Sequence, residues 1–195
     1  QPNLDTAKRT LGDVATYLDF NDFIEHEGMD AILVSNYFHE HAPFAIRALE
    51  KNIHVLSECI SNGTMAEGVA LVRAAERSNA IYMLAENYPH MKFNREMRRI
   101  FREGTLGDLL YAEGEYNHPG TPLDVPFLKT YNYFPGHWRN YLPRTYYITH
   151  SLAPIMYATG ATPRRVTAFA SYAPDTADIP SASHVGDRAA LVMTQ

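Results

Sequence analysis

Cysteine is almost absent from this sequence, since Cys59 is the only one in 195 residues. One cysteine can form neither an intrachain disulfide nor a metal cage made of cysteines alone, and such usage is typical of a reducing compartment, so we expect a cytoplasmic protein. Basic residues are also few: 17 Lys plus Arg stand against 22 Asp plus Glu. Binding to a phosphate backbone needs a basic face, so we do not expect a nucleic-acid partner.

Long apolar runs are missing as well. No stretch approaches the roughly 20 apolar residues of a membrane helix, and the N-terminus has neither the basic nor the apolar region of a signal peptide, so we expect no membrane association. An initiator Met is absent and the chain stops inside an apolar, strand-like run at 191–195. We therefore expect both ends to be incomplete. The remaining composition, 46% hydrophobic, can build a sizeable core.

Strand and helix signals alternate through the first half of the sequence. Short apolar runs predict strands at 31–35, 54–57 and 81–84, the first of them buried on both faces. Helices are predicted from His41 to Lys51 and, after the capping-box pattern Thr64-Met65-Ala66-Glu67, up to about Ser78. Such alternation with short connections predicts α/β structure with a parallel sheet.

The second half has a different character. An amphipathic helix is predicted from Phe93 to near Gly104, followed by strands at 109–116, 166–171 and 189–193 and one helix at 152–159. This arrangement predicts an α+β region with a broad sheet, beginning after a boundary near Asn87. Residues 117–147 are rich in proline and aromatic residues. Long irregular segments of this kind are usually functional or mobile.

Ligands of an open parallel sheet bind outside the carboxyl ends of its strands. Three such ends occur here, at 35–41, 57–60 and 85–88. The residues around them resemble the glucose-fructose oxidoreductase and inositol dehydrogenase (Gfo/Idh/MocA) family. The resemblance rests on the order and spacing of Asp30-Ala31-Ile32-Leu33-Val34-Ser35, His41-Ala42-Pro43, His54-Val55-Leu56-Ser57-Glu58, Gly104-Thr105-Leu106-Gly107-Asp108, and His150 ten residues before Gly160.

The resemblance implies two domains. Residues 1–87 would be the remainder of a Rossmann domain that binds NAD or NADP, a doubly wound parallel sheet whose first strands are missing. Residues 88–195 would begin a substrate domain with an open, largely antiparallel sheet, which often also carries the contacts of a homodimer or homotetramer. No G-x-G-x-x-G turn occurs in the sequence. By the resemblance that turn lies upstream of Gln1, so the choice between NAD and NADP cannot be read.

The run Glu58-Cys59-Ile60 departs from the family, whose members resembling this chain usually have Glu-Lys-Pro there. A thiol in place of the ammonium removes a fixed positive charge and three donors, so the family's acid/base assignment fails. The family's Lys-Pro bond is commonly cis, whereas a cis bond before a residue other than proline costs about 3 to 4 kcal/mol. We therefore predict a trans Cys59-Ile60 bond.

His150 is the main catalytic candidate. It matches the His of the family's Asp-x-x-x-His stretch, with Tyr146 in place of the Asp. A neutral imidazole can accept the proton of a substrate hydroxyl as hydride leaves the same carbon. Tyr146 or Tyr147 could assist as a hydroxyl donor. A buried histidine bonded to the backbone, and tyrosines that only pack the core, are the alternatives.

Six residues are candidates for the cofactor site and three for the substrate site. Ser35, Asn36, His39, Glu58, Cys59 and Asn87 match positions near the nicotinamide and its ribose, although each could instead be a cap or turn residue. Cys59 could also be a small buried apolar residue or, with less support, a nucleophile paired with His150. A metal site formed by His39, His41 and Cys59 is not expected. Substrate contacts are assigned to His118 and Trp138, whose flat faces and polar edges suit a polyol or sugar ring, and to Arg139, which with Trp138 resembles a Trp-Arg pair of the family. Packing in the core or in an oligomer interface is the alternative for the rings, and exposure to solvent is the alternative for Arg139.

The sequence thus predicts an NAD(P)-dependent oxidoreductase that acts on a sugar, a cyclitol or a related polyol. Two rivals remain open. One is a glycoside-cleaving enzyme that uses bound NAD for a transient oxidation. The other is a non-catalytic sensor of sugars or nucleotides, which the missing Lys favours.

Overall fold

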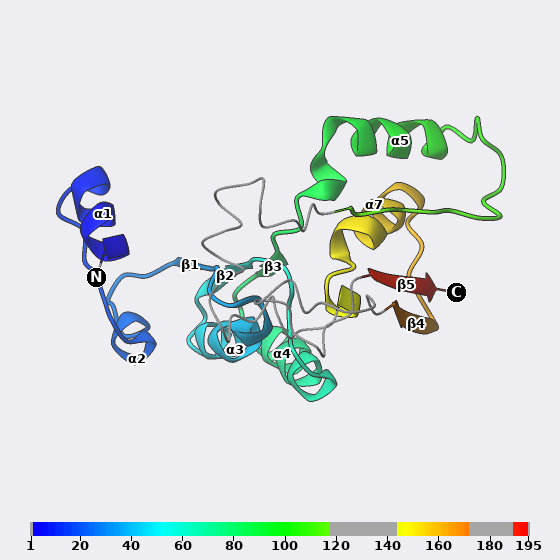
Figure 1. Cartoon of the computed structure of the whole chain (residues 1–195). Coiled ribbons are helices and arrows are strands. Elements are labelled where there is room, and N and C mark those ends of the chain that lie inside the picture. Colours follow the sequence, from blue (N-terminus) through cyan, green and yellow to red (C-terminus); the bar gives the residue numbers. More distant parts are fainter. Residues whose placement is uncertain (1, 118–143, 172–188, 195) are drawn as a thin grey trace, which may run out of the picture.

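A computed structural model describes residues 2–117, 144–171 and 189–194. Its centre is a three-stranded parallel sheet in the order β1 (Ala31–Val34), β2 (His54–Ser57) and β3 (Tyr82–Leu84). Helix α3 (His41–Glu50) connects β1 to β2, and α4 (Met65–Arg77) connects β2 to β3 (Figure 1). The predicted α/β architecture of the first half is confirmed.

The start of α4 follows from its capping box. The Thr64 hydroxyl accepts from the Glu67 backbone N–H at 3.2 Å, and the Glu67 carboxylate accepts from the Thr64 N–H at 3.0 Å. Two backbone donors that the first turn cannot satisfy are thereby paired. This reciprocal pair was predicted from the residue types and their spacing alone.

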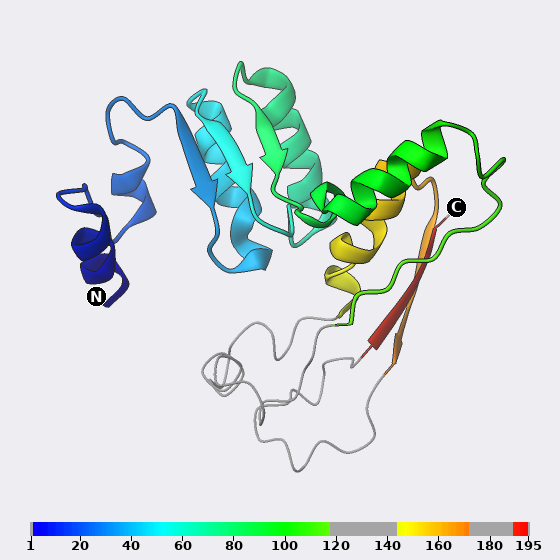
Figure 2. The same ribbon diagram turned by 90° about the horizontal axis from the view of Figure 1, so that it is seen from above.

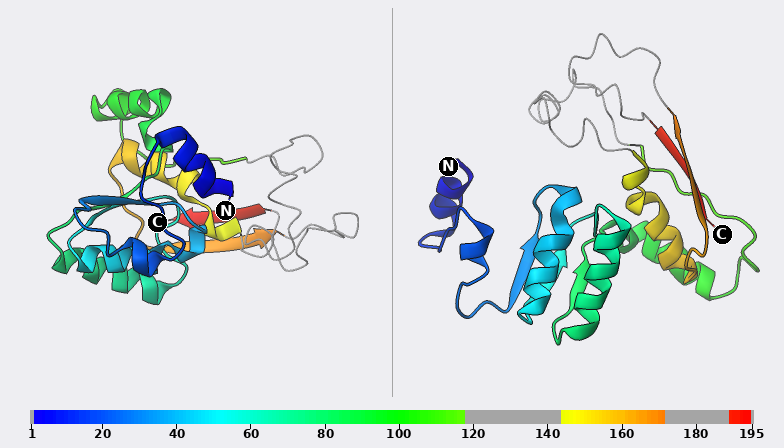
Figure 3. Two further views of the ribbon diagram at one scale, coloured as in Figure 1. Left: turned by 90° about the vertical axis from the view of Figure 1, so that its left-hand side faces the viewer. Right: turned by 90° about the horizontal axis from the view of Figure 1, so that it is seen from below.

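The strands are buried on one face only, so the prediction that the first strand is buried on both faces was wrong. Ile32 and Val34 of β1 are buried, whereas Leu33 between them is 62% exposed. Both α3 and α4 lie on the same side of the sheet (Figures 2 and 3). Leu33 and the exposed Leu56 and Met83 stand on the other side, which no described element covers. A continuous apolar run shows that both faces of a strand are apolar. It does not show whether other elements of the protein cover both faces.

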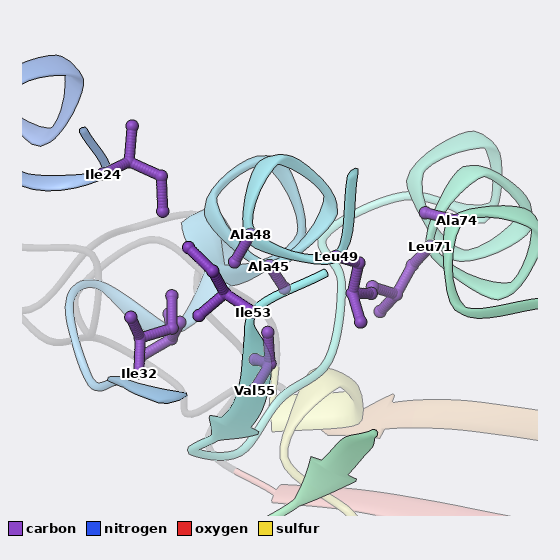
Figure 4. Packing of buried hydrophobic residues seen from close by; sticks show 10 residues of the cluster. Ile24, Ile32, Ala45, Ala48, Leu49, Ile53, Val55, Leu71 and Ala74 are labelled. Carbon is purple, nitrogen blue, oxygen red and sulfur yellow. The ribbon is translucent and has the colours of Figure 1, made fainter. Parts of the chain in front are cut away.

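The core lies between this sheet and its helices (Figure 4). Small side chains on α3 allow that helix to approach the strands closely, because alanine adds little bulk between two backbones. The buried cluster comprises Ile24, Ile32, Val34, Ala45, Ala48, Leu49, Ile53, Val55, Leu71 and Ala74. It fixes the sheet and therefore the positions of the loops that leave the strands' carboxyl ends.

The second region packs helices against each other and adds a separate pair of strands. The 3-10 helix η2 (Tyr88–His90) leads into α5 (Lys92–Arg102), and both contact α7 (Thr149–Thr159). β4 (Val166–Ser171) and β5 (Ala189–Thr194) form an antiparallel ladder in which Phe169 pairs with Leu191. The predicted fold class, a parallel sheet followed by an α+β region with antiparallel strands, is confirmed.

The remaining described elements are short or peripheral. Helices α1 (Pro2–Leu11) and α2 (Phe20–Phe23) precede the sheet, η1 (Phe38–Glu40) leads into α3, and η4 (Arg144–Tyr146) precedes α7. None of the described helices is both long enough and apolar enough to span a membrane.

The strand predicted at 109–116 is not formed. These residues have no regular structure, and Leu110 is 96% exposed. Alternating apolar residues suit a strand only where a neighbouring strand supplies hydrogen bonds, and no described segment pairs with this one. The segment instead runs close to α7: a Cβ built on Gly114 would lie 2.3 Å from the carbonyl oxygen of Ser151.

Candidate active site

Three buried polar side chains from distant parts of the sequence meet beside the carboxyl edge of the sheet. Cys59 follows β2, Glu86 follows β3, and His150 lies in the first turn of α7. Their exposed fractions are 6%, 7% and 9%. Because β2 and β3 are parallel neighbours, the residues that follow them emerge at the same edge, and α7 brings the imidazole to that edge from the second region.

These side chains form one continuous chain of hydrogen bonds with Tyr147. The Cys59 thiol donates to Glu86 Oε2 at 3.1 Å, and His150 Nδ1 lies 2.7 Å from Glu86 Oε1. The Tyr147 hydroxyl lies 3.0 Å from His150 Nε2. A carboxylate only accepts, so Nδ1 carries the proton, and in the neutral ring Nε2 accepts from Tyr147. The network therefore selects one imidazole tautomer.

The electrostatics of the site follow from burial and from this network. Burial raises the pKa of Glu86, but hydrogen bonds from His150, from the Tyr88 backbone N–H at 3.0 Å and from Cys59 together lower it below its ordinary value. Burial, followed by the hydrogen bond to Glu86, raises the pKa of the Cys59 thiol to about 12. The site therefore holds a carboxylate and a protonated thiol, and a nucleophilic role of Cys59 loses its support.

Aromatic rings enclose the imidazole. Tyr88 stacks on His150 with ring centroids 4.5 Å apart, and Tyr116 meets the same ring edge-on at 4.6 Å. Tyr116 also meets the Tyr147 ring edge-on, with ring centroids 5.5 Å apart. These contacts hold the imidazole plane in one orientation, so that its two nitrogen atoms face defined partners.

The loop that carries Cys59 is held by a buried histidine. His41 is 1% exposed, and its Nδ1 lies 2.8 Å from the Glu58 carbonyl oxygen and 2.7 Å from that of Ile60. The Cys59-Ile60 peptide bond is cis, so the predicted trans bond was wrong. The prediction considered only the intrinsic preference of a bond without proline. In the structure, contacts of His41 on both sides of Cys59 fix the backbone path of this loop.

Cys59, Glu86 and His150 are also the residues that could hold a metal ion, since their ligand atoms all lie within 4.8 Å of one another. As arranged, however, the thiol and the imidazole N–H both point their protons at the carboxylate. A metal ion would have to displace both protons, so this geometry is that of a hydrogen-bond chain. The other metal site weighed from the sequence combined His39, His41 and Cys59. In the structure, His41 Nδ1 already faces two backbone carbonyl oxygens.

The predicted cofactor residues lie where the sheet's ligand edge was expected. Ser35, Asn36, Glu58 and Asn87 are exposed and follow the carboxyl ends of β1, β2 and β3. His39 is partly buried in η1, where its ring stacks on Tyr37 and its Nε2 lies 3.8 Å from Glu40.

The other predicted residues divide into three groups. His150 occupies the centre of the hydrogen-bond chain. Tyr146 is 37% exposed, and of the two neighbouring tyrosines it is Tyr147 whose hydroxyl contacts His150. The proposed substrate residues His118, Trp138 and Arg139 lie outside the described residues.

Sequence reasoning missed Glu86 as a site residue. Its signal was present, because a glutamate directly after a buried strand at the ligand edge is a candidate by position. Asn87 was chosen from the same run because it matched the family. Only the contact between α7 and the sheet shows that residue 86 points at His150, over a separation of 64 residues.

No protein-family model matches the chain. A glycosyl hydrolase family 109 protein from Shewanella sp. (strain W3-18-1) is 27% identical over 143 residues, which cover 71% of this chain and 30% of that protein. A glycosyl hydrolase family 109 protein 1 from Shewanella sp. (strain ANA-3) is 28% identical over the same length and with the same coverage. The chain thus spans less than a third of these curated relatives.

Solved structures of sugar and cyclitol dehydrogenases are similar along nearly the whole chain. Myo-inositol 2-dehydrogenase from Lactobacillus plantarum matches with a TM-score of 0.76 at 20% identity, covering 100% of this chain and 56% of that one. Scyllo-inositol dehydrogenase from Lactobacillus casei, with NAD(H) and scyllo-inositol bound, matches with a TM-score of 0.76 at 18% identity, covering 100% and 55%. Levoglucosan dehydrogenase in complex with NADH and levoglucosan matches with a TM-score of 0.74 at 20% identity. The match covers 98% of this chain and 51% of that one. The resemblance to Gfo/Idh/MocA-type proteins inferred from the sequence is confirmed, at the level of the fold.

Proposed function

We propose that this chain belongs to an NAD(P)-dependent oxidoreductase that interconverts a hydroxyl and a carbonyl group on a sugar, a cyclitol or a related polyol. The observation that carries the proposal is the chain Glu86–His150–Tyr147 beside the carboxyl edge of a parallel sheet. That edge is where α/β proteins bind nucleotides. The dehydrogenases of similar fold, two of them solved with NAD(H) or NADH, support the cofactor. A cytoplasmic location and a homo-oligomeric state belong to the same proposal.

The residues present fit the nicotinamide end of such a cofactor. Ser35, Asn36, Glu58 and Asn87 offer exposed polar groups along one edge of the sheet, next to the buried His150. We assign the nicotinamide and its ribose to these groups. NAD(P), when bound, supplies a carbon that accepts or donates the hydride. The glycine-rich pyrophosphate turn does not occur in this sequence, so these residues account for one end of the cofactor.

His150 and Tyr147 move the proton. In the neutral tautomer selected by Glu86, Nε2 is free to accept a proton, either from Tyr147 as that hydroxyl takes the substrate proton or from the substrate hydroxyl directly. The imidazolium that results is stabilised by the ionised Glu86 at 2.7 Å. In the reductive direction the proton returns along the same atoms. Atoms and charge balance: the carbon loses its hydride to the oxidised cofactor, the hydroxyl oxygen loses its proton to Nε2 or Tyr147, and the C–O bond becomes a carbonyl.

The test is turnover of the full protein with NAD and with NADP over a panel of cyclitols and sugars, followed by absorbance of the reduced cofactor. His150→Ala should lower kcat by at least about a hundredfold, the low end for loss of a general acid/base. The matched control is His90→Ala, since His90 is an exposed histidine that meets the Tyr157 ring edge-on. Equal turnover of wild type and His150→Ala would overturn the proposal.

The curated relatives favour a second candidate, cleavage of a glycoside with the help of bound NAD. This reaction needs the same hydroxyl oxidation as a transient step, so the same proton-transfer chain would serve it. Product analysis separates the two functions. Release of a free sugar from a glycoside without net formation of reduced cofactor would favour glycoside cleavage. Binding of a sugar without any turnover would favour a sensor.

A further inference from the structure

Glu86 accepts hydrogen bonds on both of its oxygens, and the two sides differ. Oε1 receives the Tyr88 backbone N–H at 3.0 Å and faces His150 Nδ1 at 2.7 Å. Oε2 receives the Cys59 thiol at 3.1 Å. A carboxylate that is bonded on one oxygen can turn about its last side-chain bond, whereas a donor on each oxygen fixes its plane.

We propose that Cys59 is a positioning residue: its protonated thiol holds Glu86 so that Oε1 faces His150 Nδ1, which fixes the imidazole tautomer with Nε2 toward Tyr147. This inference rests on the proposed function and deepens it by assigning a role to the residue at which the chain departs from the family it resembles. Cys59 acts through Glu86 and is not itself assigned a contact with substrate.

The thiol is well placed for this role because its own loop is fixed. Cys59 is 6% exposed, and His41 contacts the backbone carbonyl groups on both sides of it. The Cys59 backbone N–H also lies 3.3 Å from Glu58 Oε2. A donor on an anchored loop restrains its acceptor, whereas a donor on a mobile loop would move with it.

A neutral donor also has an electrostatic consequence. The ammonium that the resembling family carries at this position would form an ion pair with Glu86, and would compete with the imidazole for the negative charge. The thiol supplies a hydrogen bond without a positive charge, so the carboxylate remains available to stabilise a protonated His150. Cys59→Lys should therefore lower kcat instead of restoring a family-like enzyme.

The groups that face Glu86 come from three elements. After β2 there is the Cys59 thiol, on which the charge of the Glu58 carboxylate also acts. From η2 comes the Tyr88 backbone N–H, and from α7 come His150 and the buried hydroxyl of Thr149. Because the Cys59 hydrogen bond is one of those that lower the pKa of Glu86, its loss should raise that pKa. The pH at which Glu86 takes up a proton, followed by its carboxyl infrared band, should then be higher in Cys59→Ala than in wild type.

The experiment compares wild type, Cys59→Ala and Cys59→Ser in the full chain. Cys59→Ala should lower kcat roughly tenfold, the effect of one hydrogen bond to a charged group, with KM changed by less than about twofold. Cys59→Ser keeps a hydroxyl donor and should recover most of kcat and the wild-type pH of Glu86 protonation. Ser57→Ala is the control, because Ser57 is equally buried at the same strand end and its hydroxyl is bonded to the Glu58 carbonyl. A Cys59→Ser variant as slow as Cys59→Ala, or a Glu86 that takes up its proton at the same pH in Cys59→Ala as in wild type, would overturn the inference.

Two spectroscopic measurements keep the test independent of turnover. The ¹⁵N chemical shifts of the His150 ring report its tautomer, which should be single in wild type and Cys59→Ser and mixed in Cys59→Ala. The infrared S–H stretch, isolated as the difference between wild type and Cys59→Ser, should lie at the lower frequency of a thiol that donates to a carboxylate. If no polyol is turned over, the proposed function fails while these spectra still test Cys59. If Cys59→Ala does not fold, an S–H band at the free-thiol frequency in wild type would still refute the inference.

Discussion

Glu86 is a carboxylate kept ionised inside the protein, and this has a consequence for stability. Its pKa in the folded state is lowered from the ordinary value of 4.5, so near that pH the unfolded chain binds more protons than the folded one. The stabilisation is therefore complete above pH 4.5 and is lost as the pH falls through the lower, folded-state pKa. Burial opposes this shift and the hydrogen bonds from His150, Tyr88 and Cys59 outweigh it.

Urea unfolding of wild type and Glu86→Gln, from neutral pH down through 4.5, checks this prediction. The difference in free energy of unfolding should be largest at neutral pH and should shrink below 4.5, where wild-type Glu86 takes up a proton and resembles the amide. Glu27→Gln serves as the control, because Glu27 is exposed and should show no such pH dependence. A difference that stays constant over the whole range would mean that Glu86 is not held as an anion.

For single residues, the sequence indicates which side chains are candidates for the site better than it indicates which side chains contact one another. His150 was identified from the resemblance, because its chemistry and its distance from Gly160 are local properties. Glu86 and Tyr147 take their roles from contacts between α7 and the strand ends, and no local pattern encodes those contacts. The cis Cys59-Ile60 bond was not predicted either, because the intrinsic preference of a bond without proline is trans.

The segment 109–117 can lie against α7 because Gly114, in the middle of it, has no side chain. A Cβ on Gly114 would lie 2.3 Å from the Ser151 carbonyl oxygen and 3.2 Å from the Ile155 side chain. The backbone oxygen cannot move aside without distorting the first turn of α7, which carries His150. Tyr116, which follows Gly114 by two residues in the same segment, contacts both His150 and Tyr147.

Gly114→Ala should therefore destabilise the protein by about 1 to 3 kcal/mol, the usual cost of inserting a methyl group into a packed contact. It should also lower turnover, because Tyr116 must shift with the segment. Urea unfolding and the dehydrogenase assay measure the two effects. Glu115→Ala, at the exposed neighbouring position, should change neither appreciably. An unchanged free energy of unfolding in Gly114→Ala would show that the segment does not pack on α7.

Elements that are stabilised by local interactions were predicted correctly, whereas those that depend on distant parts of the chain were not. Helix α4 was predicted with its start because its capping box is a local interaction of Thr64 and Glu67. The strand predicted at 109–116 was wrong because a strand depends on a neighbouring strand, which hydrophobic alternation does not specify. Burial on both faces of β1 was wrong in the same way, because coverage of a face is a property of the whole sheet.

Over the whole molecule, the hydrogen bond between Glu86 and His150 joins two structurally distinct regions. Glu86 follows the last strand of the parallel sheet, and His150 belongs to α7, which packs on α5 and η2. Both side chains are buried, so removal of either one deprives the other of one hydrogen-bond partner inside the protein. The proposed catalytic pair is in this way also a connection between the sheet and the helical region.

A double-mutant cycle measures this connection. Glu86→Ala and His150→Ala should each destabilise the protein, and the double variant should be more stable than the sum of the two changes predicts, with a coupling energy of about 1 to 3 kcal/mol. Glu96 and Arg99 on α5 provide the control cycle. They form an exposed pair at 2.7 Å within one helix, for which a much smaller coupling is expected because solvent screens the two charges. If the changes at 86 and 150 add without coupling, the two regions are joined by other contacts, and the relay between sheet and α7 contributes to chemistry alone.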